Sequence, residues 1–187
     1  MGILPPSKRL MTEKYDLHCH STVSDGTLSP TALVQRAHKQ GVTMLALTDH
    51  DTTAGIDEAK EAAAQTGIKL IAGIELSASW QDKTFHILGL GINPAYPPLL
   101  GATRHLQTVR LERAKQISEK LEKGRITGAL EVVTNAAGDS MITRTHFADF
   151  LVSQNHVSSQ QEAFDRYLAK GKPAYVATVW AEMALAV

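Results

Sequence analysis

The sequence has almost no cysteine, no excess of charge of one sign and no long apolar run. Its 187 residues include one cysteine, Cys19, so no disulfide can form within the chain, which fits a reducing compartment. The 19 lysines and arginines balance the 19 aspartates and glutamates, so no net positive charge attracts nucleic acid. No apolar run approaches the ~20 residues of a membrane span. We therefore expect a cytoplasmic protein that binds its ligands at a local site, without a membrane or a stable protein partner.

The first part of the chain alternates between short apolar segments and helix-forming segments. Residues 1–14 contain Pro5-Pro6 and lack the apolar core of a signal peptide, so we interpret them as a flexible leader. Val42–Leu47 is an uninterrupted apolar run, which is typical of a strand covered on both faces. Strands that alternate with helices through short connections predict an α/β fold with parallel strands over residues 15–94.

The expected elements follow from this alternation and from the capping residues. Strands are expected at Tyr15–Leu17, Val42–Leu47, Lys69–Ile74 and Phe85–Leu90, and helices from Pro30, capped by Ser29, to Gly41 and from Gly55 to Thr66. Residues 95–172 are interpreted as a helical insertion with helices at Leu99–Lys123, Ala129–Ala137, Thr145–Gln154 and Ser159–Ala169. Residues 173–187 would begin the return to the sheet, with a further apolar helix from Trp180.

Two histidines follow the first expected strand with one residue between them. Side chains two residues apart on a strand point the same way, so His18 and His20 can direct both imidazoles at one metal ion. Asp25 follows in the next loop and can add an oxygen ligand. A His-x-His pair alone is weak evidence, because ordinary surface histidines also occur at this spacing.

The next strands end in residues of the same kinds. Val42–Leu47 is followed by Thr48-Asp49-His50-Asp51 and Lys69–Ile74 by Glu75, and a histidine lies within the fourth strand. Active sites of α/β proteins are built where the carboxyl ends of parallel strands meet. The candidate metal ligands and catalytic residues are therefore His18, His20, Asp25, His50, Glu75 and His86. We expect Asp51 to cap the following helix, whereas a role for Asp49 in orienting His50 is left open.

Together these motifs resemble one family of metal-dependent phosphoesterases. The motifs are His18-Cys19-His20-Ser21, Ser24-Asp25-Gly26, Thr48-Asp49-His50-Asp51, Gly73-Ile74-Glu75 and His86, and they resemble the PHP (polymerase and histidinol phosphatase) family. Further along, Thr143-Arg144-Thr145-His146-Phe147-Ala148 and Gly171-Lys172-Pro173-Ala174-Tyr175-Val176 resemble its RNase AM branch. The resemblance implies a distorted seven-stranded (β/α) barrel, incomplete here, that hydrolyses phosphate esters of nucleotides or RNA with metal-activated water. That branch contains 5′→3′ exoribonucleases and 3′,5′-nucleoside bisphosphate 3′-phosphatases.

The resemblance also implies a ligand set for up to three divalent ions, with Mn²⁺ expected and Fe²⁺ or Zn²⁺ as alternatives. By this assignment His18 and His20 bind the first ion, Glu75 bridges the first and second, and His86 binds the second. Asp25 and His50 bind the third ion. Arg144 and His146 could contact the phosphate or base of a nucleotide or short RNA substrate, or they could only cap a helix and face solvent.

Several alternatives remain open. The family pattern has three later ligands, in an Ala-His-Pro strand and a final Asp-x-His pair, that this sequence does not reach, so the chain could be an inactive fragment with a partial metal site. A histidinol phosphatase is a second alternative within the family. An amidohydrolase-type deaminase also begins with His-x-His, but the ends of the second and third strands argue against it. On the long helix, Arg104, Arg110 and Arg113 are expected to form a solvated face, and binding of a substrate strand is the alternative hypothesis.

Overall fold

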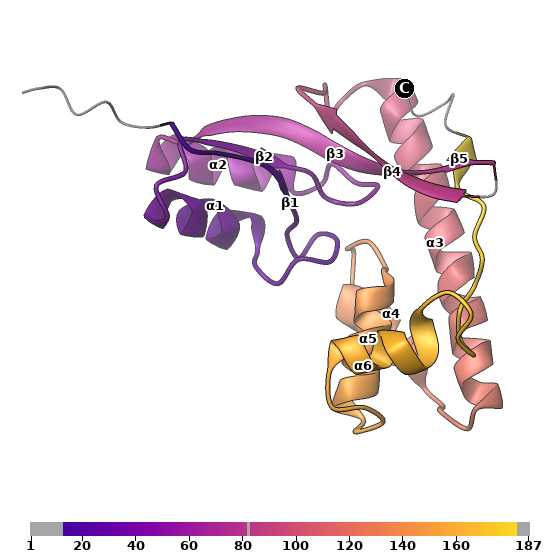
Figure 1. Cartoon of the computed structure of the whole chain (residues 1–187). Helices are drawn as coiled ribbons and strands as arrows, with labels where there is room; N and C mark the ends of the chain where they lie inside the picture. The colour runs from indigo at the N-terminus through magenta and orange to yellow at the C-terminus, as the bar shows by residue number, and fades with distance from the viewer. Residues whose placement is uncertain (1–12, 82, 183–187) are drawn as a thin grey trace, which may run out of the picture.

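The computed structural model describes residues 13–81 and 83–182, which form one mixed sheet with helices on one face and at one end (Figure 1). The strands are β1 (Tyr15–Cys19), β2 (Met44–Leu47), β3 (Lys69–Trp80), β4 (Lys83–Leu90) and β5 (Ala181–Glu182). Their order is β1-β2-β3-β4, and β5 pairs with β3. The prediction of an α/β fold is confirmed.

Of the four strands that the sequence predicts, only the first three pair in parallel. β2 lies between β1 and β3 and is parallel to both. β4 is antiparallel to β3 over its full length, so the expectation of a fourth parallel strand is wrong. The chain reverses directly after β3, where Gln81 has a φ of 47°, and antiparallel neighbours need no crossover helix. β3 also extends beyond Ile74 to Trp80, which places Glu75 in the middle of a strand and not at its end.

Two helices connect the parallel strands and cover one face of the sheet (Figure 1). They are α1 (Pro30–Lys39) and α2 (Ile56–Thr66). The hydroxyl of Ser29 accepts a hydrogen bond from the amide of Ala32, which confirms the predicted cap of α1. Buried residues from both helices pack with the strands beneath them: Val34, Leu45, Leu47, Ala59, Ala62 and Ile68. This core holds the carboxyl ends of β1 and β2 side by side.

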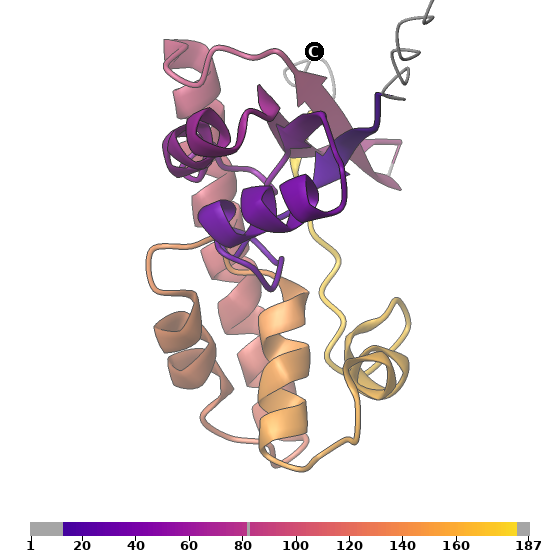
Figure 2. The ribbon, with the colours of Figure 1, turned by 90° about the vertical axis from the view of Figure 1, so that its left-hand side faces the viewer.

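The remaining helices form a second core beside the end of the sheet (Figure 2). They are α3 (Pro97–Lys123), α4 (Ala129–Ala137), α5 (Arg144–Ser153), α6 (Gln160–Ala163) and the π-helix η1 (Phe164–Leu168). Their shared core contains Ile117, Leu121, Val133, Phe147, Leu151 and Leu168. The helix expected over Ser159–Ala169 is thus divided into α6, which Ser159 caps, and η1. As predicted, this part of the described chain contains no strand.

The chain returns to the sheet after η1 along an extended path. The amide of Trp180 donates a hydrogen bond of 2.9 Å to the hydroxyl of Ser79, and β5 then pairs in parallel with β3. The helix expected from Trp180 is wrong at Ala181–Glu182, because the Trp180 side chain is buried against Ile74 and Leu76, which draws the chain along β3.

Two sets of predicted segments lie outside the described residues, namely 183–187 and residues 1–12 of the leader. The division of the chain at residues 14, 94 and 172 stays a prediction. Within the described part of the chain, no helix is both long enough and apolar enough to cross a bilayer.

Replacing Leu151 by alanine should lower the free energy of unfolding by about 2–5 kcal/mol, because truncation leaves a cavity in the second core. Leu151 is completely buried there, with 0% of its surface exposed. Chemical denaturation followed by circular dichroism measures the change. Val132→Ala is the control, because Val132 on α4 is 41% exposed and should change stability by less than about 0.5 kcal/mol. Equal losses from both substitutions would contradict this account of the helical core.

Candidate metal centre

Glu75 is the centre of a cluster of four histidines. Its carboxylate is almost fully buried, and its Oε2 lies 2.8 Å from Nε2 of His18 and 3.0 Å from Nε2 of His20. The same oxygen lies 3.7 Å from Nδ1 of His50. The other oxygen, Oε1, lies 3.3 Å from Nδ1 of His86. One carboxylate with two oxygens therefore joins side chains from β1, β4 and the loops that follow β1 and β2.

Asp25 extends this cluster on the side of His20 and His50. Its Oδ1 lies 3.5 Å from Nδ1 of His20, and its Oδ2 lies 3.7 Å from Nε2 of His50. All six predicted ligands are thus brought together. They form three overlapping groups whose candidate ligand atoms lie within 4.8 Å of one another: His18, His20 and Glu75; His20, Asp25 and His50; His50, Glu75 and His86.

The geometry of the donor atoms fits divalent metal ions. Nδ1 of His50 is buried and has no hydrogen-bond partner among the described residues. Nε2 of His18 and Nε2 of His20 lie 3.1 Å apart, and ligands bound at about 2.1 Å from one ion lie roughly 3 Å from each other. Burial lowers the pKa of His50 to about 3, although Glu75 raises it, so the imidazole is neutral and keeps a lone pair for a metal. Imidazoles with carboxylates suit Mn²⁺, Fe²⁺ or Zn²⁺.

Asp49 fixes the loop that carries Asp25. Its two carboxylate oxygens accept hydrogen bonds of 2.7 Å from the amide of Ser21, the hydroxyl of Ser21 and the hydroxyl of Ser24. All three residues are buried. The sequence left open whether Asp49 orients the imidazole of His50. The hydrogen bonds of Asp49 go to the two serines and not to that imidazole, so Asp49 holds the loop.

Gly26 completes this loop by allowing the backbone to fold back on itself. A Cβ atom at Gly26 would lie 2.1 Å from the carbonyl oxygen of His20 and 2.5 Å from its carbonyl carbon. No side chain fits at that distance. The close approach places Asp25, the residue before the glycine, next to the imidazole of His20.

The backbone after His50 is held by a buried ion pair. Asp51 is fully buried with a φ of 54°, and it accepts hydrogen bonds from the amide and hydroxyl of Ser77 at 2.6 and 2.8 Å. Nε of Arg110 donates a third hydrogen bond of 2.7 Å. The predicted capping role of Asp51 is wrong, because Gly55 occupies the N-cap position directly before α2. The solvated position expected for Arg110 is also wrong, since only 6% of it is exposed.

A cavity of about 350 Å³ opens onto the cluster. It is lined by three of the candidate ligands, Asp25, His50 and His86, and by basic, polar and aromatic residues from the helices and the returning chain, among them Arg110, Arg113, Arg144, Lys170, Tyr175 and Trp180. Arg144 was predicted from the sequence as a substrate contact, Arg113 was expected to be solvated, and Lys170 was not among the predicted site residues. Arg110 and Arg113 lie three residues apart on one helix and therefore on the same face of it. This spacing was the signal in the sequence that the two side chains could line one site.

Of the two predicted substrate contacts, only Arg144 lines this cavity. Nδ1 of His146 instead accepts a hydrogen bond of 3.2 Å from the amide of Thr143, and Thr143 caps α5. Burial is the main cause that lowers the pKa of His146. Its visible contacts are those of a helix cap.

Comparison with known proteins identifies the family. The PHP domain model matches residues 16–177. The chain belongs to the PHP family. It is 48% identical over 177 residues to a 5′-3′ exoribonuclease of Haemophilus influenzae, with 95% of this chain and 64% of that protein covered. It is 44% identical to a 3′,5′-nucleoside bisphosphate phosphatase of Chromobacterium violaceum, with 90% and 59% covered. The chain thus spans 64% and 59% of the lengths of these two curated relatives.

Two solved structures share the fold. One, from Chromobacterium violaceum, is described as an amidohydrolase with bound sulfate and no metal; its TM-score is 0.88 at 44% identity, over 93% of this chain and 62% of that one. The other, from Bifidobacterium adolescentis, is assigned as a metal-dependent phosphoesterase; its TM-score is 0.87 at 31% identity, over 94% and 62%. The predicted α/β PHP barrel, of which this chain contains a part, is confirmed.

Replacing Arg110 by methionine should lower the free energy of unfolding by about 3–5 kcal/mol, because Asp51 would stay buried without its cation. Thermal and denaturant unfolding of the two proteins measure the loss. Arg104→Met on the same helix is the matched control, since Arg104 is exposed and should cost little. The double variant Asp51→Asn with Arg110→Met should lose less than Arg110→Met alone. An Arg110→Met protein as stable as Arg104→Met would refute the role of the pair.

Proposed function

We propose that this protein is a metal-dependent phosphoesterase that hydrolyses phosphate esters of nucleotides or RNA, as a 5′→3′ exoribonuclease and a 3′-phosphatase of 3′,5′-nucleoside bisphosphates. The observation that carries the proposal is the meeting of six metal-binding side chains around Glu75, beside a cavity lined by arginines. The printed names of the two relatives, an exoribonuclease and a bisphosphate phosphatase, both describe hydrolysis of nucleotide phosphate esters.

The proposed ligand set uses all six side chains. His18 and His20 would hold the first ion, Glu75 would bridge the first and second, and His86 would hold the second, while Asp25 and His50 would hold the third. We propose Mn²⁺, with Fe²⁺ or Zn²⁺ as alternatives. When bound, such ions lower the pKa of a water molecule, so that hydroxide is available near neutral pH, and offset the charge on phosphate.

The protein's own side chains position the site and bind the substrate. Asp49 and Asp51 hold the two loops that carry Asp25 and His50. The guanidinium group of Arg144 has a shape that matches two phosphate oxygens, so it can orient the ester in the cavity. A substrate contact by His146 is also part of this proposal.

A covalent intermediate on the protein is not part of the proposal. None of the described residues that line the cavity is a serine or a cysteine. Burial raises the pKa of the Cys19 thiol to about 12, and the thiol donates a hydrogen bond to the carbonyl oxygen of Ala46. A thiol with such a pKa is a poor nucleophile at neutral pH.

We also propose a cytoplasmic location, on the ground that Cys19 is the only cysteine.

His20→Ala and Glu75→Ala should each lower bound metal and reduce hydrolysis at least about 100-fold with little change in fold, because each removes a ligand from the cluster. Elemental analysis for Mn, Fe and Zn, release of phosphate from adenosine 3′,5′-bisphosphate, and circular dichroism provide the three readouts. His38→Ala is the control, since His38 is exposed on α1.

Each alternative gives a different result in the same assays. Unchanged turnover in both variants would reject the ligand assignment. Ammonia release without phosphate release would favour a deaminase. Absence of metal and of turnover in the unaltered protein would favour an inactive fragment.

A further inference from the structure

The two proposed ligands of the third ion, Asp25 and His50, are carried by different loops. Asp25 lies in the loop after β1, and His50 lies in the loop after β2. Oδ2 of Asp25 and Nε2 of His50 are 3.7 Å apart. One ion can bind both atoms only while this separation is kept, because each ligand atom must lie about 2 Å from the metal. The contacts that hold the two loops therefore decide whether this ion binds.

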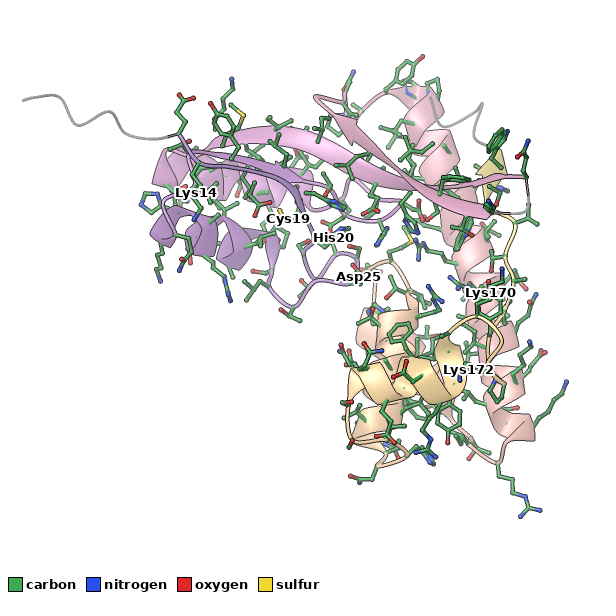
Figure 3. The ribbon with its side chains drawn as sticks, in the orientation of Figure 1. Lys14, Cys19, His20, Asp25, Lys170 and Lys172 are labelled. Atoms are coloured by element: carbon green, nitrogen blue, oxygen red, sulfur yellow. The ribbon has the colours of Figure 1, made fainter. Side chains whose placement is uncertain are left out.

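The loop that carries Asp25 is held by the helical part of the chain. The amide of Met141, shortly before α5, donates a hydrogen bond of 2.9 Å to the carbonyl oxygen of Val23. Met141 is buried, with 4% of its surface exposed. Figure 3 shows Asp25 where its loop approaches the helices. This contact adds to the hydrogen bonds of Asp49, which holds the same loop from the side of the sheet.

Arg110 holds the loop that carries His50 and also reaches the segment before α5. Its Nε donates a hydrogen bond of 2.7 Å to the carboxylate of Asp51, the residue after His50. Its Nη1 donates a hydrogen bond of 3.3 Å to the carbonyl oxygen of Ile142, which follows Met141 directly. One guanidinium group therefore joins the backbone beside His50 to the segment that holds the other loop.

A guanidinium group suits this position because its donors point in fixed directions. It is planar and carries N–H groups on three nitrogens, so it can bond several acceptors at once. The third nitrogen of Arg110, Nη2, donates a hydrogen bond of 3.1 Å to the hydroxyl of Ser77 on β3. A lysine would bring one compact ammonium group, which can keep the ion pair with Asp51 but cannot span all three acceptors.

We propose that Arg110 is a positioning residue for the third metal ion, and that it fixes the separation of His50 and Asp25 without touching the ion. This role rests on the proposed function, in which these two side chains bind that ion. The other two ions have ligands on or beside β1, β3 and β4 and should depend less on Arg110. The helical part of the chain thus takes part in metal binding, although none of the six assigned ligands belongs to it. By linkage, binding of the ion strengthens the contact between the helices and the loop.

The first test is the metal affinity of Arg110→Lys, measured by calorimetry with Mn²⁺ and by elemental analysis after dialysis. The variant should fold, because the charge beside Asp51 is kept, and should bind one ion at least about tenfold more weakly while the affinity for the others is unchanged. Arg104→Lys, the same substitution at an exposed position of α3, should bind every ion as the unaltered protein does.

Two results of this measurement would overturn the role of Arg110. One is an Arg110→Lys protein that binds every ion with unaltered affinity. The other is an equal loss of affinity for every ion, because the residue would then support the fold as a whole and not one metal site.

The second test uses the unaltered protein and does not depend on how a variant folds. Deuterium exchange of single amides is followed by NMR with and without saturating Zn²⁺, which has no unpaired electrons. Exchange of the Met141 amide should slow at least about threefold more than exchange of the His156 amide, because binding of the ion strengthens the contact with the loop. The His156 amide is the control, since it donates to the carbonyl oxygen of Leu151 within the helical core. Equal slowing of both amides, or no slowing at Met141, would contradict the coupling.

The same proteins separate the role of Arg110 from the proposed function. An unaltered protein that binds ions but releases no phosphate from adenosine 3′,5′-bisphosphate rejects the function, and the affinities of the variants still decide the role of Arg110. An active unaltered protein whose ions bind equally well to Arg110→Lys keeps the function and rejects the role. If the unaltered protein binds no ion, both are rejected.

Discussion

The buried ion pair between Asp51 and Arg110 joins the two parts of this molecule at the site. Asp51 follows His50 directly, and its carboxylate also accepts hydrogen bonds from the amide and hydroxyl of Ser77 on β3. Arg110 comes from α3 and lies with its guanidinium 5.0 Å from the ring centre of Trp180. One contact thus relates the loop after β2, the middle of β3, the long helix and the returning chain. This contact holds the backbone directly after His50, whose side chain lines the cavity.

Much of the candidate site could be predicted because its signals are local. The two-residue spacing of His18 and His20 and the polar residues that end apolar runs are visible within a few positions of the sequence. What surrounds them is not local. From its neighbours in sequence, Asp51 is predicted to cap a helix. Its partner Arg110 is 59 positions away along the chain, so their ion pair leaves no local signal. The charge of Arg113 looks solvated for the same reason, since nothing near it in sequence reveals the cavity.

The fold could also be predicted only where its signals are local. The prediction failed where distant parts of the chain meet. Alternating apolar and helical segments indicate β1, β2 and the start of β3 correctly. They do not reveal that the chain reverses after Trp80, because that reversal depends on the conformation of Gln81 and on pairing with β4. The apolar stretch after Trp180 has the composition of a helix. Its two described residues, Ala181–Glu182, form β5 instead, because β3 continues beyond the end of β2 and offers a free edge there.

The contact between Trp180 and Ser79 has a consequence for the order in which the molecule assembles. The two residues are separated by 101 positions, and such distant contacts form slowly because a long loop must first be closed. The helices from α3 to η1 lie within that loop and build their own core. The pairing of β1 with β2 and the hairpin of β3 and β4 need only shorter loops, whereas β5 is added when the long loop closes. We therefore expect the strands that carry the histidines to pair before the returning chain closes the cavity beside them.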